Sequence, residues 1–344
     1  MPIAPAEPGP STRYWSTYQL AFLAILAFAL VAVAAGVVFD VIEAPPPDEG
    51  TSAPADSSDD GGEQASSDRG RVLVTLPPEL DEASGIAVNA ESGVVWAHND
   101  DPGSAILFAL DLEGRLLRAF EVSGVRVADL EDVARAPCPG ERDRSCLYLA
   151  DTGDNNRSRT ASQIVALAEP STADAEIEVV GSAIFTYEDG RGRDVESLAV
   201  SGERVLRVSK GQDGAAEVFE LGLEALAPVE ARSSGESAAG SPAIARRVAT
   251  LSIDVSQDTN RPTGAAISPD GESLAVRTAQ TVYRFRLDDL EAAPVTCSIG
   301  FEEPQGEAID FLDDERVLLT GEMGSGPNPA PLIELECPSS TDPA

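Results

Sequence analysis

Residues 263–276 read TGAAISPDGESLAV and contain the pattern that decides the fold. A short run of small and apolar residues is followed by Ser-Pro-Asp-Gly and then by a second apolar run. Proline presets the backbone angle that a turn needs, and aspartate and glycine favour a tight reversal. The stretch therefore predicts two consecutive antiparallel strands, the first of which starts at a polar residue, Thr263.

The same unit recurs along the chain from residue 71 onward. Its polar first position is found at Ser84, Glu131, Glu196, Thr263 and Glu307. A second and a third apolar run follow each start, and four of the five units also have a fourth run. The segment 71–77, RVLVTLP, can supply the strand that the last unit lacks. Repeated four-stranded units predict an all-β chain folded as a single β-propeller, with five blades favoured. The alternatives are a sixth blade within 222–245 and a β-sandwich.

Charge narrows the range of functions. The chain of 344 residues has 24 Lys and Arg against 59 Asp and Glu, a formal net charge of −35. So negative a field repels phosphate backbones, and we expect no nucleic-acid partner. There is one lysine, Lys210, and one histidine, His98, so a histidine-rich metal cluster is excluded.

The amino-terminal part predicts a membrane anchor. Leu20–Phe39 is an apolar run long enough to span a bilayer as a helix, and the residues beyond it are acidic. A cleaved signal peptide ending near Ala32-Val33-Ala34 is the alternative. The expected organisation is a cytoplasmic segment (1–18), a transmembrane signal anchor (19–39), a disordered acidic Pro/Ser-rich tether (40–70), the propeller (71–337) and a tail (338–344). We therefore expect a single-pass membrane protein with its N-terminus inside and a monomeric ectodomain outside.

Several motifs carry a family resemblance over about residues 80–335. The SPDGESLAV segment resembles the turn and strand of bacterial YVTN/TolB-like propellers. Together with SGIAV, HND, DLEDVA, ADTGDN, DVESLAV and QGEA, it resembles secreted or membrane-anchored bacterial propellers near the phytase-like and esterase-like families. The resemblance implies a propeller at the bacterial cell membrane, and hydrolysis of phosphate or carboxylate esters as an activity.

In a propeller, the starts of the inner strands and the ends of the second strands lie on one face. This geometry predicts that Glu131, Glu196 and Glu307 converge at the mouth of the channel. Oxygen ligands without Cys or His favour Ca²⁺. We therefore expect one Ca²⁺ at these three residues. The alternative is that the acids pair with Arg126, Arg193 and Arg277 or face solvent.

Further site residues follow from the same face. Glu131, Glu196 and His98 are candidate catalytic residues. Candidate ligand-binding residues are Asn99, Asp100, Asp151, Asp154, Asn155, Lys210 and Arg277. Because no complete catalytic motif is present, the main expectation is a non-enzymatic binding or scaffold module for an envelope ligand. The alternative is a metal-assisted hydrolase of phosphate or carboxylate esters acting on a small anionic substrate.

The four cysteines predict two disulfides. Cys138 and Cys146 flank a short loop between adjacent strands, so they can meet easily. Cys297 lies on the outer strand of the fourth unit and Cys337 ends the third strand of the fifth. A bridge between these two would tie down the carboxyl end near the point of ring closure.

Overall fold

The Ser-Pro-Asp-Gly segment forms the predicted turn. Gly271 has φ +75°, in the region that glycine adopts without strain. The Ser268 hydroxyl donates to Asp270 Oδ1 at 2.6 Å and accepts the Ser273 N–H at 3.0 Å. The turn joins β15 (Gly264–Ile267) to β16 (Ser273–Arg277), which pair antiparallel. The expectation of a strand, a turn and a second strand is confirmed.

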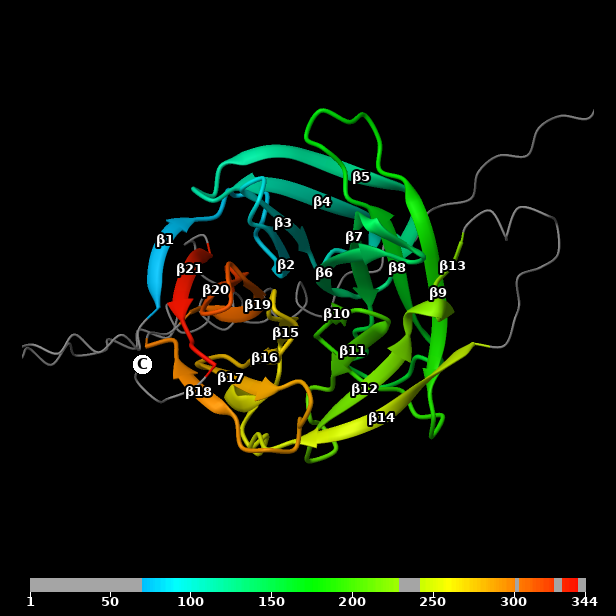
Figure 1. The fold of residues 1–344 in the computed structure, drawn as a ribbon, viewed down its shortest axis with the longest axis vertical. Helices are drawn as coiled ribbons and strands as arrows, with labels where there is room; N and C mark the ends of the chain where they lie inside the picture. The colour runs from blue at the N-terminus through cyan, green and yellow to red at the C-terminus, as the bar shows by residue number, and fades with distance from the viewer. Residues whose placement is uncertain (1–69, 229–241, 301–302, 325–329, 340–344) are drawn as a thin grey trace, which may run out of the picture. The chain divides into compact units, whose positions relative to one another are not determined.

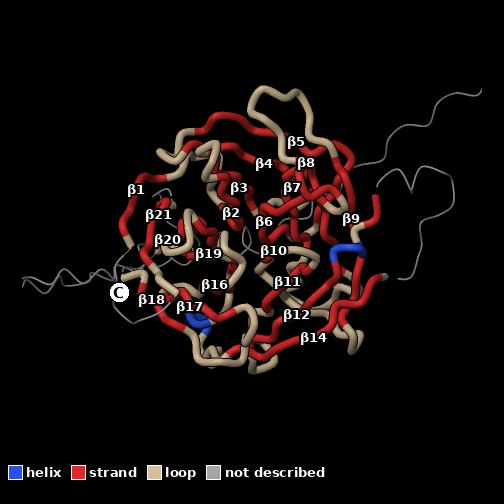
Figure 2. Tube along the Cα trace, viewed as in Figure 1, coloured by secondary structure: helices blue, strands red, loops and turns tan. Residues whose placement is uncertain are grey.

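The computed structural model describes residues 70–228, 242–300, 303–324 and 330–339. All of them belong to the unit Gln64–Ala344. Within these ranges the chain is all-β, and its helical turns are two short 3-10 segments, Leu223–Ala225 and Asp258–Asn260. Figure 2 shows strands and loops in almost every described part of the chain.

The strands form sets of four that follow the sequence. The first set is β2 (Ala83–Asn89), β3 (Val94–Asn99), β4 (Gly103–Asp111) and β5 (Leu116–Val127). The second set is β6 (Leu130–Cys138), β7 (Glu141–Asp151), β8 (Ser162–Ala168) and β9 (Val179–Tyr187). The third set is β10 (Ala199–Ser201), β11 (Arg204–Val208), β12 (Ala216–Gly222) and β14 (Ala243–Leu251). The fourth set is β15, β16, β17 (Thr281–Arg286) and β18 (Val295–Ser298).

The last set is completed by the beginning of the domain. It contains β19 (Gln305–Phe311), β20 (Arg316–Glu322), β21 (Pro331–Glu336) and β1 (Arg71–Thr75). β1 pairs antiparallel with β21, so that Arg71 lies opposite Glu334. The prediction that 71–77 supplies the missing strand is confirmed. Figure 1 shows β1 at the outer edge beside β21, with β19 toward the centre.

Two of the sets are also joined to each other. β14 runs parallel to β9, with Ala243 opposite Phe185, and this pairing links the second and third sets into one continuous sheet. The short strand β13 (Ala227–Pro228) pairs with β9 as well. Residues 229–241, most of the segment in which a sixth blade was considered, lie outside the described residues.

The apolar core lies between neighbouring sets. One cluster of buried side chains joins the first and second sets through Trp96, Leu107 and Leu147. Another joins the last and first sets through Leu318, Leu332 and Ile86. Further clusters occupy the interfaces from the second set to the third, the third to the fourth and the fourth to the last. Each set thus packs against two others, which is consistent with a β-propeller.

The burial pattern changes from the inside of a set to its outside. Every residue of β16 is buried, because neighbouring sets cover both of its faces. On the outer strand β14, buried residues alternate with exposed ones over much of the strand. The inner strands β2, β6, β10, β15 and β19 lie nearest the centre in Figure 1.

The expected localisation in a single-pass membrane protein is contradicted. Within the described part of the chain, no helix has the length and apolar character needed to cross a bilayer. The segment 19–39, for which the anchor was predicted, lies outside the described residues. So do residues 1–18 and most of the predicted tether.

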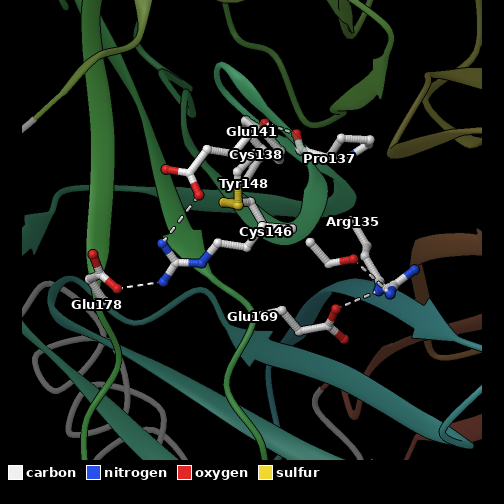
Figure 3. The surroundings of a disulfide bond; sticks show 10 residues. Arg135, Pro137, Cys138, Glu141, Cys146, Tyr148, Glu169 and Glu178 are labelled. Carbon is white, nitrogen blue, oxygen red and sulfur yellow. Dashed lines mark hydrogen bonds and ion pairs between the residues drawn. A yellow bond between two sulfur atoms is a disulfide. The ribbon is translucent and has the colours of Figure 1, made fainter.

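Both predicted disulfides are present. Cys138 is bonded to Cys146, eight residues away, in the hairpin of β6 and β7. Figure 3 shows this bond beside the Tyr148 hydroxyl, which donates to the Pro137 carbonyl oxygen. Cys297 on β18 is bonded to Cys337, which follows β21. The second bond connects the fourth set to the last set, which contains the closing strand.

The two disulfides should differ in their contribution to stability. In the chain-entropy relation, the bond with a sequence separation of 40 stabilises by about 4 kcal/mol and the bond with a separation of 8 by about 2.5 kcal/mol. We expect the Cys297→Ser/Cys337→Ser variant to lose more unfolding free energy in urea than Cys138→Ser/Cys146→Ser. An equal or smaller loss would contradict this order.

Candidate functional site

A shift in pairing register recurs near the first residues of three inner strands. The edge of the sheets at which these strands start is called the rim below. The pairing register shifts between Ala83 and Gly85 in β2, between Leu130 and Asp132 in β6, and between Gly306 and Ala308 in β19. The residue within each shift is the polar start of a repeat: Ser84, Glu131 or Glu307. Such bulges re-aim a side chain and are frequent beside functional sites.

Two groups of carboxylates meet at this rim and share Glu131. The first group is Asp100, Asp129 and Glu131, and the second group is Glu131, Asp194 and Glu196. In each group, one oxygen atom per residue lies within 4.8 Å of the others. Glu131 is the second residue of β6, Asp129 precedes that strand, and Asp100 follows β3. The packing of neighbouring sets therefore brings together groups that are far apart in the sequence.

The first group has no direct cationic partner among the described residues. Glu131 is 5% exposed, and its pKa is raised well above the ordinary value by burial and by the charges of Asp100 and Asp129. Burial and the neighbouring Asp129 raise the pKa of Asp100 to about 8. Burial likewise raises the pKa of Asp129. Three adjacent carboxylates stay ionised together only if a cation compensates them.

The chain's only lysine, Lys210, contacts the second group. The Lys210 ammonium donates to Glu196 Oε1 and lies 4.0 Å from Asp194 Oδ2. Asp194 Oδ2 also accepts from Gln212 Nε2 at 2.8 Å, and Asp194 Oδ1 accepts the Asp154 N–H at 2.9 Å. Glu196 Oε2 is buried without a hydrogen-bond partner.

Further acids extend the rim toward β19 and β20. Glu307 accepts a hydrogen bond from Gln305 Nε2 at 2.9 Å, and burial raises its pKa. Burial and the charges of Glu307 and Glu82 raise the pKa of Glu322 to about 7. A pKa near neutrality is the range that suits a general acid or base at physiological pH.

A glycine makes room for the first group. A Cβ atom at Gly153 would collide with Glu131 Oε1 and with the carboxyl group of Asp129. Gly153 belongs to the ADTGDN motif, which therefore has a steric role at the site.

Several predicted ligand-binding residues make hydrogen bonds within the protein. Asp151 accepts a hydrogen bond from the Arg159 guanidinium at 2.8 Å. Asp154 accepts the backbone N–H groups of Ser158 and Arg159 at 2.7 and 2.9 Å, and Asn155 is exposed beside it. Both carboxylates are therefore used in holding the loop that follows β7.

The buried Arg277 is also unavailable to a ligand. It donates to the carbonyl oxygens of Ala308 and Thr320 at 2.8 and 2.6 Å and pairs with Glu303. Its side chain has no exposed surface. It therefore connects β16 to the last set of strands.

His98 and Asn99 lie at the end of β3. His98 has no exposed surface, and its Nδ1 lies 3.1 Å from the Asn99 carbonyl oxygen. Burial lowers the pKa of His98 to about 4, so the ring is neutral at physiological pH. The predicted catalytic residue His98 therefore lies beneath the surface of the rim and not on it. Asn99 Nδ2 donates to the Glu79 carbonyl oxygen at 2.9 Å.

The predicted metal ligands are only partly brought together. Glu131 and Glu196 belong to one carboxylate group, but Glu307 belongs to neither. Asp129, Asp194 and Asp100 complete the groups. All three lie at starts of inner strands or ends of second strands, which the propeller geometry places on one face, but that geometry does not show which oxygen atoms approach one another.

The donor set fits a hard divalent cation. All the groups offer carboxylate oxygens, which Ca²⁺ and Mg²⁺ prefer over nitrogen or sulfur. The two buried oxygens Glu196 Oε2 and Asp100 Oδ1 have no hydrogen-bond partner. A buried oxygen without a partner destabilises the folded protein, and a bound cation would remove this destabilisation.

Comparison with known proteins gives similarity in structure only. No protein-family model and no curated protein matches the chain. The chain is similar to the PQQ-bound aldose sugar dehydrogenase of Streptomyces coelicolor (18% identity, 78% of this chain and 97% of that chain covered, TM-score 0.44). It is also similar to regucalcin, a calcium-binding protein of Agrobacterium tumefaciens (16%, 79% and 97%, TM-score 0.41). A third similar structure is a gluconolactonase of Xanthomonas campestris (11%, 74% and 72%, TM-score 0.39).

These findings correct two expectations. The resemblance holds at the level of β-propeller-like proteins, and the YVTN/TolB-like assignment is not confirmed. The main expectation of a non-enzymatic binding or scaffold module was wrong. The rim concentrates buried carboxylates with raised pKa values, an arrangement typical of catalytic sites.

A carboxylate away from the rim gives a pH-dependent prediction. Asp310 on β19 accepts the N–H groups of Val88 and Phe311 at 2.6 and 2.8 Å, and burial raises its pKa to about 7. Between pH 4 and 7 the folded protein therefore keeps a proton that the unfolded chain releases. The stability contributed by this group is complete below about pH 4 and is lost as the pH rises through 7.

We therefore expect Asp310→Asn to become more stable relative to the natural chain as the pH rises from 4 to 8. The measurement is the unfolding free energy in urea at several pH values. Asp313→Asn, which changes a side chain that is 44% exposed, is the control and should not gain stability over this range. If the difference in unfolding free energy between Asp310→Asn and the natural chain did not change with pH, the raised pKa of Asp310 would be contradicted.

Proposed function

We propose that the protein is a five-bladed β-propeller, spanning residues 71–337, that hydrolyses uncharged carboxylic esters with a Ca²⁺ ion at the inner rim. The observation that carries the proposal is the first group, Asp100, Asp129 and Glu131, in which three carboxylates lie together without an ion pair to a cationic side chain among the described residues. The five four-stranded sets support the number of blades.

The first group would hold the cation. Its three carboxylates come from the residue after β3, the residue before β6 and β6 itself. Such irregular oxygen sites suit the flexible coordination of Ca²⁺ better than the strict octahedron of Mg²⁺. When bound, the ion would polarise the ester carbonyl and increase the acidity of a water molecule. Gly153 would keep the space that the ligands occupy.

The charge at the rim favours an uncharged substrate. The charge of Asp194 raises the pKa of Glu131, and that of Glu322 raises the pKa of Asp100. Lys210 is already engaged by Glu196. Arg277, expected to neutralise an anionic substrate, is buried. A phosphate monoester would therefore meet more negative than positive charge, whereas a carboxylic ester carries no charge to be repelled.

Glu322 would transfer the proton. Its pKa of about 7 lets it accept a proton from water as the water oxygen attacks the carbonyl carbon. The same carboxyl group would then give the proton to the departing alkoxide as the ester bond breaks. The products are a carboxylic acid and an alcohol, and Glu322 returns to its initial state.

Two substitutions separate the binding role from the catalytic role. We expect hydrolysis of p-nitrophenyl acetate that requires Ca²⁺, and little hydrolysis of p-nitrophenyl phosphate. Glu131→Gln should lose both Ca²⁺ binding in calorimetry and hydrolysis. Glu322→Gln should retain Ca²⁺ binding but lose about 10²–10⁴-fold in kcat, the usual contribution of a general base.

Glu203→Gln is the matched control, because it makes the same chemical change at an exposed carboxylate that pairs with Arg142. It should leave both measurements unchanged. The absence of Ca²⁺ binding by the natural chain, or an esterase activity that chelators do not affect, would contradict the proposal.

A further inference from the structure

The only lysine of the chain lies inside the carboxylate cluster. Lys210 lies two residues after the end of β11, and its backbone N–H donates to the Asp194 carbonyl oxygen at 3.1 Å. Its side chain is 22% exposed, and its ammonium contacts Glu196. The backbone hydrogen bond and the ion pair together fix this positive charge at the second group.

The two carboxylate groups therefore differ in one respect. Both offer three oxygens within 4.8 Å of one another, and both use Glu131. Only the second group has a direct ion pair to a cationic side chain among the described residues. The partly exposed ammonium also lies near Glu307 and Glu322, whose pKa values it lowers.

We propose that the Lys210 ammonium occupies the second of two adjacent cation positions, so that the protein binds one divalent ion at the first group and excludes another from the second. This inference rests on the proposed function, because it takes the first group as the metal site. It assigns Lys210 as a positioning residue that sets the number of ions bound.

The reason is electrostatic and steric. An ion ligated by Glu131, Asp194 and Glu196 would need Glu196 Oε1, which Lys210 already holds. The ion and the ammonium would also be like charges a few ångströms apart in a partly buried site, where repulsion is poorly screened. Without the ammonium, Glu196 would be a buried carboxylate lacking an ion pair, and the group would be free to take a second cation.

Counting the bound ions tests the proposal. We expect the natural chain to bind one Ca²⁺ per molecule in isothermal titration calorimetry and equilibrium dialysis. Lys210→Met, which keeps most of the length of the side chain but removes its charge, should bind two. Lys210→Arg, which keeps the charge, is the matched control and should still bind one.

The outcomes separate this inference from the proposed function. No Ca²⁺ bound by the natural chain would overturn both. One ion in the natural chain and one in Lys210→Met, at the same affinity, would overturn only the role of Lys210. Two ions in the natural chain would also overturn that role while leaving the metal site in place.

A measurement on the natural chain covers the case in which Lys210→Met does not fold. Because the sequence has one lysine, ¹⁵N-lysine labelling gives a single Nζ resonance. We expect this resonance to persist, with slowly exchanging ammonium protons, when the first ion binds, because Lys210 remains on Glu196. Loss of the protected signal on addition of Ca²⁺ would show that the ion displaces the lysine and would overturn the proposal.

Discussion

The antiparallel pairing of β1 with β21 is the constraint on which the arrangement depends. It places the beginning and the end of the domain in one sheet, and that sheet packs on the first set through Leu318, Leu332 and Ile86. Every set then has two neighbours, and the starts of the inner strands meet around one centre. The Cys297–Cys337 bond supports the same junction, because it connects the last set to the fourth.

The packing of the sets around one centre has an electrostatic consequence. Acids that would be separately solvated in an open chain are brought within 4.8 Å of one another at the rim, where burial removes much of the water that stabilises their charge. The protein compensates this concentration of negative charge in two ways. In the second group a lysine compensates the charge, and in the first group the pKa values rise. The proposed cation is the remaining form of compensation for the first group.

The sequence predicted most of the fold and part of the site. Alternating apolar runs and the turn at Pro269-Asp270-Gly271 are local signals, so the strands and their order were predicted, including the closing strand. Side-chain approach is not local. The register shifts beside Glu131 and Glu307 depend on pairing with the next strand, and neither the exclusion of Glu307 from both carboxylate groups nor the inclusion of Asp129 could be foreseen. Arg277 and His98 looked like ligand groups because burial cannot be read from residue type.

The most direct test of the central claim is a crystal structure of the chain grown with Mn²⁺, in which anomalous scattering locates the ion. The account predicts one strong anomalous peak within coordination distance of the carboxylates of Asp100, Asp129 and Glu131, with the Lys210 ammonium still on Glu196. A map that has no peak at the rim, or that shows these three carboxylates apart and separately hydrated, would contradict it.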